Sequence, residues 1–234
     1  MKYMGSKRRI AKEILPLMLS EREIGQFWVE PFVGGGNMID KVTGNRIGSD
    51  VNPYTIQALI SIRDNVDQLP KNNQEFTESD YKALRKSDDY KFKGYAGFAF
   101  SFGAKWEGGW CRGRGSSKNR DYVKESYDNA VKQSPYLQGV EFYNCSYDEL
   151  PIPKNSIIYC DPPYANTSKY KDSIDHDKFW NWCRQKSKQG HKVFISEYNA
   201  PDDFKCIWEK EIVMNLNNKN QNVQNRIEKL FTII

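Results

Sequence analysis

Residues 156–164 read Ser-Ile-Ile-Tyr-Cys-Asp-Pro-Pro-Tyr, and this stretch is the starting point for the fold. The run from Ser156 to Cys160 has the length and apolar composition of a buried β-strand. Asp161 and two prolines follow directly, and prolines cannot continue a central strand because they lack a backbone donor. Ligands of open α/β sheets bind beyond the carboxyl ends of the strands. We therefore expect Asp161 to Tyr164 to lie at a ligand site.

The residues from Asp161 to Tyr164 indicate a particular chemistry. The Asp161 carboxylate and the Pro162 carbonyl are neighbouring hydrogen-bond acceptors, and the Tyr164 ring follows two residues later. Two such acceptors suit the two hydrogens of an amino group on a planar base, with Tyr164 stacked on the base and a sulfonium methyl as the electrophile. Transfer of this kind needs positioning and electrostatics, not a covalent intermediate. The chain has no Pro-Cys dipeptide of the type used by cytosine-C5 enzymes. The alternative is a rigid turn without chemistry.

Strand and helix signals alternate on both sides of this stretch. The expected strands are 26–30, 46–50, 140–143, 156–160 and 192–196, and the expected helices are 6–20, 38–42, 53–63 and 175–188. Such alternation is typical of an α/β sheet with mostly parallel strands. It lapses between residues 66 and 138, where helices are expected near 78–86, 92–102 and 120–133. The runs 210–216 and 227–234 predict a closing hairpin with its turn at 217–222. The simplest interpretation is a nucleotide-binding α/β sheet with an insert.

A glycine-rich turn, Glu30-Pro31-Phe32-Val33-Gly34-Gly35-Gly36, follows the strand expected at 26–30. Glycines allow positive φ and close approach of the backbone to a ligand. The spacing is not GxGxxG and no GK[ST] follows, which disfavours dinucleotide and P-loop sites. Asp50 ends the next strand, where an acid can accept hydrogen bonds from ribose hydroxyls. Together these features favour an adenosine-containing cofactor without a phosphate tail. The alternatives are a plain tight turn, and capping of the following helix by Asp50 or Asn52.

The composition narrows the class of protein. The chain has 234 residues and a formal net charge of +5, which fits one domain with an insert and is compatible with nucleic-acid binding. The five cysteines include no CxxC pair and there are only two histidines, so we expect no metal site and no complete disulfide framework. No apolar run is long enough to span a membrane, and residues 1–14 lack the apolar stretch of a signal peptide. We expect a cytoplasmic protein that does not bind membranes.

Four motifs occur in a fixed order along the chain. They are KYMGSK at 2–7, EPFVGGG at 30–36, SDVNPYTIQAL at 49–59 and YCDPPY at 159–164, with NCSYDEL at 144–150 as a further match. In this order they resemble the Dam-type (D12) class of DNA adenine N6-methyltransferases, and the resemblance covers both flanks of the chain. Two mild departures are Tyr3, where many relatives carry Trp, and GGG in place of the commoner GAG or GSG.

The resemblance implies a fold, a cofactor and a role for each matching residue. The fold is an α/β, Rossmann-like sheet of the kind found in S-adenosylmethionine-dependent methyltransferases, formed by residues 1–66 and 139–234, with a mainly helical target-recognition insert at 67–138. The catalytic residues are Asp161, Pro162 and Tyr164. S-adenosyl-L-methionine is implied as the cofactor, bound by Tyr3, Lys7, Glu30, Pro31, Phe32, Gly34, Gly36, Asp50, Cys145, Ser146, Tyr147 and Asp161. From the residues alone, Lys7 is equally one of a solvated run with Arg8 and Arg9, and Tyr147 a core aromatic.

A basic segment within the insert, residues 105–120, supplies candidates for DNA contact. Its cations are Lys105, Arg112, Arg114, Lys118 and Arg120, interleaved with glycines and two tryptophans. Such a composition suits phosphate contact and stacking, which an enzyme needs if it flips an adenine out of the duplex. Arg112 and Arg114 suit guanine edges or phosphates. The alternative is a solvated surface loop.

The expected activity is that of a site-specific DNA-methyltransferase (adenine-specific). It would transfer a methyl group in line from S-adenosylmethionine to adenine N6 in double-stranded DNA by base flipping. One alternative is an RNA or protein-amide N-methyltransferase, because related (N/D)PPY motifs occur there. Another is a catalytically silent methyltransferase-like DNA-binding protein. The sequence leaves open the recognition site, the oligomeric state, any preference for hemimethylated DNA, and whether the enzyme is solitary, from a phage or part of a restriction–modification system.

Overall fold

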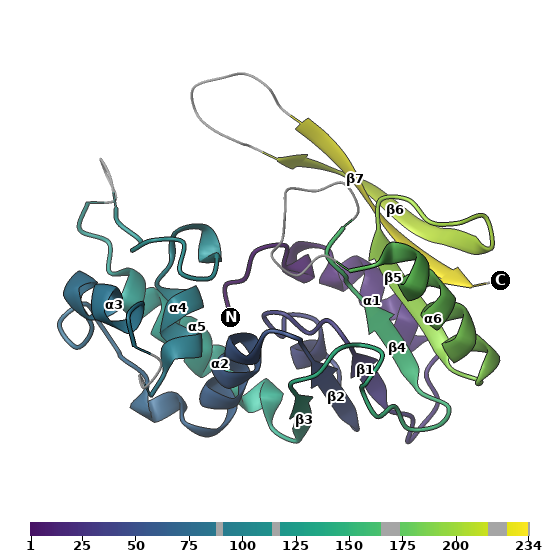
Figure 1. Cartoon of the computed structure of the whole chain (residues 1–234), viewed down its shortest axis with the longest axis horizontal. Coiled ribbons are helices and arrows are strands. Elements are labelled where there is room, and N and C mark those ends of the chain that lie inside the picture. Colours follow the sequence, from purple (N-terminus) through teal and green to yellow (C-terminus); the bar gives the residue numbers. More distant parts are fainter. Residues whose placement is uncertain (88–90, 114–117, 165–173, 215–223, 234) are drawn as a thin grey trace. The chain divides into compact units, whose positions relative to one another are not determined.

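The computed structural model describes residues 1–87, 91–113, 118–164, 174–214 and 224–233 (Figure 1). The chain divides into two compact units. Unit 1 consists of residues Met1–Ala11 and Val33–Leu150, and unit 2 consists of Lys12–Phe32 and Pro151–Ile234. Each unit has strands and helices of its own.

Unit 2 is built on a sheet whose strands run in the order β1 (Trp28–Glu30), β4 (Ile157–Cys160), β5 (Lys192–Glu197), β7 (Gln224–Ile233) and β6 (Phe204–Met214). The first three are parallel, with Val29 opposite Ile158 and Cys160 opposite Ile195. β7 runs antiparallel to β5, and β6 runs antiparallel to β7. β1 and β4 are buried along their whole length, as expected of central parallel strands with both faces covered.

Two helices cover this sheet, α1 (Ala11–Leu19) behind it and α6 (His176–Lys188) in front of it (Figure 1). Apolar residues at helical spacing make the buried face of α6, namely Phe179, Trp182 and Cys183. The helix begins where the Asp175 side chain accepts a hydrogen bond from the Lys178 N–H at 3.0 Å. Sequence periodicity and capping therefore account for the position of α6.

Unit 1 contains the parallel pair β2 (Arg46–Ser49) and β3 (Val140–Tyr143), with α2 (Pro53–Asp64) beginning soon after β2. The Asn52 side chain caps α2 by accepting from the Tyr54 N–H at 3.0 Å, and Pro53 occupies its first turn. The remaining helices are α3 (Glu78–Leu84), α4 (Lys93–Ala99) and α5 (Tyr122–Leu137), with short 3-10 turns η1 (Lys7–Arg9), η2 (Ile39–Lys41), η3 (Val66–Gln68) and η4 (Phe102–Ala104).

The expected α/β fold with mostly parallel strands is confirmed. Some elements differ from expectation: 6–20 is divided into η1 and α1, the helix expected at 92–102 ends at Ala99, 38–42 is the 3-10 turn η2, β6 begins at Phe204, and α5 extends to Leu137 with Pro135 inside it. Arg46 explains the last difference, because its guanidinium donates to the Tyr136 and Gln138 carbonyls, each at 2.6 Å, and so satisfies the helix end. The expected turn at 217–222 lies outside the described residues. The boundaries of the insert, 67–138, stay a prediction.

No helix in the part of the chain that the structure describes has both the length and the apolar character needed to cross a bilayer.

Candidate cofactor and catalytic sites

The glycine turn, Val33–Gly36, is held by both backbone and side-chain hydrogen bonds. The Val33 N–H donates to the Ser49 carbonyl at 2.8 Å, and the Gly36 N–H donates to the Val33 carbonyl at 2.9 Å. Gly34 and Gly36 have φ angles of +48° and +65°, in the left-handed region that favours glycine. The Gly34 N–H also donates to Oδ2 of Asp50 at 3.2 Å. The two features predicted at neighbouring strand ends are therefore in direct contact.

The KYMGSK motif packs against this turn. A Cβ atom on Gly34 would lie 2.9 Å from a ring carbon of Tyr3, so the ring occupies the space that glycine leaves. Lys7 is buried and donates to the Gly5 carbonyl at 3.2 Å, whereas Arg8 and Arg9 are exposed. Lys7 is thus set apart from the solvated run to which the residues alone would assign it.

Asp50 and the NCSYDEL motif meet at the ends of β2 and β3. The Asn144 side chain donates to the carbonyls of Asp50 at 2.9 Å and Val51 at 3.0 Å, which fixes the start of the motif beside Asp50. Oδ1 of Asp50 accepts from the Asn52 N–H at 2.9 Å, while Asn52 itself caps α2. Cys145 and Ser146 are half-buried, and burial raises the pKa of the Cys145 thiol. Tyr147 is buried.

The DPPY loop, Asp161–Tyr164, follows β4 in unit 2. Pro162 is buried, and Asp161 and Tyr164 are half-buried. The Tyr164 hydroxyl donates to Oε2 of Glu228 on β7 at 2.8 Å. Its ring meets Tyr198 edge-on, with 4.5 Å between ring centroids. Burial of the hydroxyl, then the charges of Asp161 and Glu228, raise the pKa of Tyr164 well above its ordinary value, so the hydroxyl remains a donor at neutral pH.

Buried aromatic residues support the strands that lead to this loop. Tyr159 on β4 shares a hydrogen bond of 2.8 Å with Ser196 on β5, and its ring stacks with Trp28 at 6.0 Å. The Trp28 indole donates to Oε1 of the buried Glu30 at 2.7 Å. A buried carboxylate needs such a partner. Glu30, predicted to contact the cofactor, is therefore also part of the core of unit 2.

Pro31 and Phe32 lead from β1 into the glycine turn. Pro31 is buried, and the Phe32 ring packs edge-on against Phe179 of α6 at 5.7 Å. These two predicted cofactor residues therefore lie with Glu30 in unit 2.

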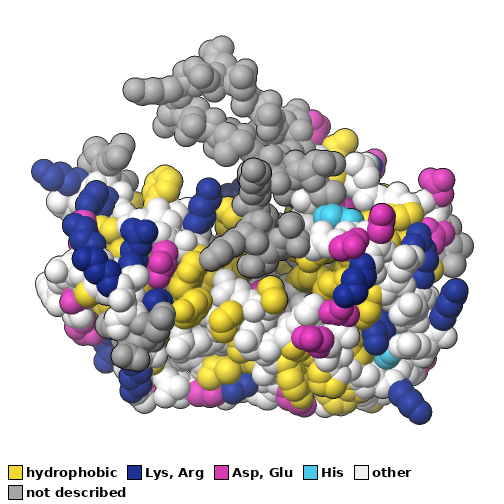
Figure 2. All heavy atoms as spheres, viewed as in Figure 1, with side chains coloured by type: hydrophobic (Ala, Val, Ile, Leu, Met, Phe, Trp, Pro, Cys, Tyr) yellow, Lys and Arg dark blue, Asp and Glu magenta, His cyan; other side chains and the backbone are white. Residues whose placement is uncertain are grey.

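The basic segment lies in unit 1, where Figure 2 shows Lys and Arg side chains gathered over the region of α3, α4 and α5. Lys105, Arg112, Lys118 and Arg120 are exposed, and Arg114 lies outside the described residues. Two of these cations are in ion pairs: Arg112 Nε donates to Glu78 at 3.0 Å, and Arg120 Nη2 donates to Glu125 at 2.8 Å. The described cations of the segment are therefore at the surface, and two of them have carboxylate partners.

Sequence reasoning missed three residues at these sites. Tyr198 directly follows β5, so the strand-end rule that found Asp161 also applies to it. Glu228 lies on the antiparallel strand β7 and gives no comparable signal. Gln133 on α5 contacts the glycine turn and is visible in the sequence only as a polar residue on the apolar stripe of a helix.

Among the described residues, no three His, Cys, Asp or Glu side chains come together as a group able to hold a metal ion.

Residues 3–95 match the family model described as D12 class N6 adenine-specific DNA methyltransferase. This match agrees with the expected resemblance over 93 of the chain's 234 residues. Among curated relatives, the type II methyltransferase M.FokI of Planomicrobium okeanokoites is 24% identical over 210 residues, which cover 76% of this chain and 31% of that protein. The DNA adenine methylase of Vibrio cholerae serotype O1 (strain ATCC 39541) is 27% identical over 188 residues, covering 72% of this chain and 65% of its own.

The chain thus spans about a third of the first relative and somewhat under two-thirds of the second. Among solved structures, TrmN from Thermus thermophilus aligns with 98% of this chain and 50% of its own, with a TM-score of 0.41 and 8% identity.

Proposed function

We propose that this chain is an adenine-specific DNA methyltransferase that transfers a methyl group from S-adenosyl-L-methionine to N6 of adenine. The observation that carries the proposal is the DPPY loop at the carboxyl end of β4, where Tyr164 is fixed by Glu228 and Tyr198. The D12 match of residues 3–95 supports the same assignment.

The residues around the glycine turn fit the proposed cofactor. Gly34 and Gly36 have positive φ angles, so the turn adopts a backbone conformation that other residues rarely take, and Tyr3 packs against it. Asp50 accepts from two main-chain N–H groups, which hold its carboxylate at the end of β2, where an acid can accept hydrogen bonds from ribose hydroxyls. We assign the methionine part to Phe32, Gly34, Gly36 and Lys7, the ribose to Asp50, and the adenine to Cys145, Ser146 and Tyr147.

When bound, the cofactor supplies a sulfonium methyl. The chain's own residues then hold the target amino group: the Asp161 carboxylate and the Pro162 carbonyl accept its two hydrogens, which directs the nitrogen lone pair away from the ring. Tyr164 stacks on the extruded base with its own ring held at the hydroxyl by Glu228. Extrusion costs a few kcal/mol of unstacking and unpairing. Because the Tyr164 ring is already held in place, it loses less conformational entropy when the base stacks on it.

We assign duplex DNA to the basic segment. Arg112 and Arg120 lie at the surface in ion pairs with Glu78 and Glu125. Exposed ion pairs are weak and screened by salt, so a phosphate can replace either carboxylate as the partner of the guanidinium. Glu78 and Glu125 would then compete with the phosphates for the two guanidinium groups, so that only well-placed phosphates replace the carboxylates.

Incubation of the chain with methyl-labelled S-adenosylmethionine and, in parallel, duplex DNA, RNA and protein tests the proposal. We expect label in DNA only, recovered as N6-methyladenine. Label found only in RNA or only in protein would show that this molecule, and not DNA, is the substrate. Cofactor binding without any transfer would indicate a catalytically silent relative.

A further inference from the structure

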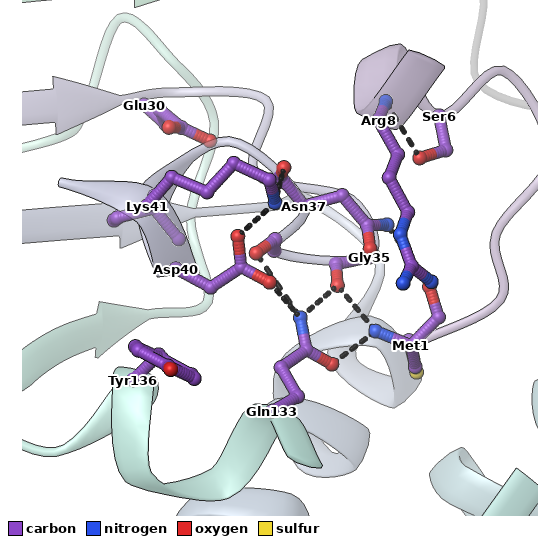
Figure 3. Close-up of polar contacts among 12 residues, drawn as sticks. Met1, Ser6, Arg8, Glu30, Gly35, Asn37, Asp40, Lys41, Gln133 and Tyr136 are labelled. Atoms are coloured by element: carbon purple, nitrogen blue, oxygen red, sulfur yellow. Dashed lines mark hydrogen bonds and ion pairs between the residues drawn. The ribbon is translucent and has the colours of Figure 1, made fainter. Parts of the chain in front are cut away.

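Gln133 is a buried polar residue on the apolar stripe of α5, among Val123, Ala130 and Leu137. Its side-chain Nε2 lies 3.1 Å from the Gly35 carbonyl oxygen, 3.1 Å from the Gly36 carbonyl oxygen and 2.9 Å from Oδ2 of Asp40 (Figure 3). Its Oε1 accepts from the Met1 amino group. The whole carboxamide is therefore used on the glycine turn and its immediate neighbours.

These contacts have a physical reason. Buried main-chain carbonyls need donors, and those of Gly35 and Gly36 face α5, so a helix without a donor at position 133 would leave each of them with one donor fewer. Further donors complete the pairing: the Met1 amino group reaches the Gly35 carbonyl at 2.9 Å, and the Asp40 N–H reaches the Gly36 carbonyl at 3.3 Å. Asp40 is the third acceptor around the same Nε2, so the two hydrogens of this nitrogen are shared among the two carbonyls and the Asp40 carboxylate.

Gln133 and Tyr3 contact different parts of the turn. Tyr3 packs against Gly34, whereas a Cβ on Gly36 would lie 2.9 Å from Leu59 and 3.6 Å from Nε2 of Gln133. With carbonyls paired to Gln133, the peptide units at Gly35 and Gly36 are fixed in one orientation. The direction of the neighbouring N–H groups follows from that orientation.

We infer that Gln133 is a positioning residue that holds the glycine turn in the form that receives the methionine part of S-adenosylmethionine. This rests on the proposed function. It also means that a helix placed by sequence in the predicted recognition insert supplies part of the cofactor site.

The test compares Gln133→Met with Gln138→Met. Methionine keeps the length and volume of glutamine but removes the amide. Gln138 provides a matched control at the end of α5, because its Nε2 donates to the carbonyls of Arg63 at 2.7 Å and Ser134 at 3.3 Å, not to the glycine turn. Calorimetric titration with S-adenosylmethionine gives Kd, steady-state kinetics gives KM and kcat, and circular dichroism checks folding.

We expect Gln133→Met to raise the Kd and the KM for S-adenosylmethionine on the order of tenfold, with kcat at saturating cofactor within about twofold of wild type. Gln138→Met should leave all three near wild type. A merely structural role would lower the active fraction, and hence kcat, at unchanged KM, and would overturn the inference.

Asp40→Ala is a second variant in case Gln133→Met does not fold. It removes one partner of Nε2 at a half-buried position, and we expect a rise of about threefold in Kd. A wild-type chain that binds no S-adenosylmethionine would overturn the proposed function and this inference with it. A wild type that binds, with Gln133→Met or Asp40→Ala binding equally well, would overturn the inference alone.

Discussion

The glycine turn and the DPPY loop follow two buried parallel strands, β1 and β4, but different parts of the chain hold them in place. Backbone groups and three side chains fix the glycine turn: Val33 pairs with Ser49, and Asp50 and Gln133 bind its peptide units under the Tyr3 ring. Side chains from distant segments fix the DPPY loop, since Tyr164 bonds to Glu228, 64 residues along the chain. The glycine turn contributes a backbone conformation that distant side chains support, whereas the DPPY loop contributes functional groups of its own.

This difference predicts that the DPPY loop is the more sensitive to loss of one functional group. Asp161→Ala should lower the rate of methyl transfer by about a thousandfold or to background, because it removes an acceptor for the target amino group. It should also weaken cofactor binding while leaving nonspecific DNA affinity largely intact. Asp203→Ala is the matched control, because Asp203 is a surface carboxylate of the same unit, paired with Arg184 at 2.6 Å. Transfer at the normal rate by Asp161→Ala would remove the basis of the catalytic assignment.

The glycine turn should instead be sensitive to substitutions that alter its backbone conformation. Gly34→Ala places a methyl group 2.9 Å from the Tyr3 ring at a φ of +48°, so strain and overlap act together. We expect the KM for S-adenosylmethionine to rise by about tenfold, measured by steady-state kinetics. Gly25→Ala isolates the strain, because Gly25 has a φ of +86° and an added methyl group there would meet nothing within 4 Å. Equal KM values in the two variants would mean that the turn does not shape the cofactor site.

The smallest effect concerns the support of the Tyr164 ring. Tyr164→Phe keeps the stacking surface and loses the hydrogen bond to Glu228, so kcat should fall by about two- to fivefold. Glu228→Ala should cost a similar factor, and the double variant should be no slower than the slower single variant. A double-mutant cycle on kcat measures this coupling. Losses that multiply in the double variant would show that the two residues act independently.

The parts of the fold that follow from local pattern were predictable. The apolar runs before Asp161 and Asp50 identified β4 and β2, and Asn52 with Pro53 marked the start of α2. The glycine turn was visible because positive φ angles demand glycine, which the sequence displays directly. The length of α5 was not, because Pro135 suggests an earlier end and the Arg46 guanidinium that satisfies the final carbonyls lies far away in sequence.

The parts of the site that depend on distant pairing were not predictable. Lys7 stands in a run of three cations, and only the fold buries it while Arg8 and Arg9 stay exposed. Arg112 reads as a free cation in a basic segment, yet its partner Glu78 lies 34 residues earlier. Gln133 and Glu228 act through carbonyls and a hydroxyl that tertiary packing brings to them. Spacing within a motif carries no information about such partners.

The most direct test of the proposed methyl transfer is a map of N6-methyladenine in DNA. Genomic DNA without adenine methylation would be incubated with S-adenosylmethionine and either the wild-type chain or Asp161→Ala, then sequenced by a method that detects modified bases. The proposed function predicts N6-methyladenine at adenines that share one short flanking sequence in the wild-type sample, and none in the Asp161→Ala sample. Absence of N6-methyladenine in the wild-type sample, or equal methylation by Asp161→Ala, would contradict it.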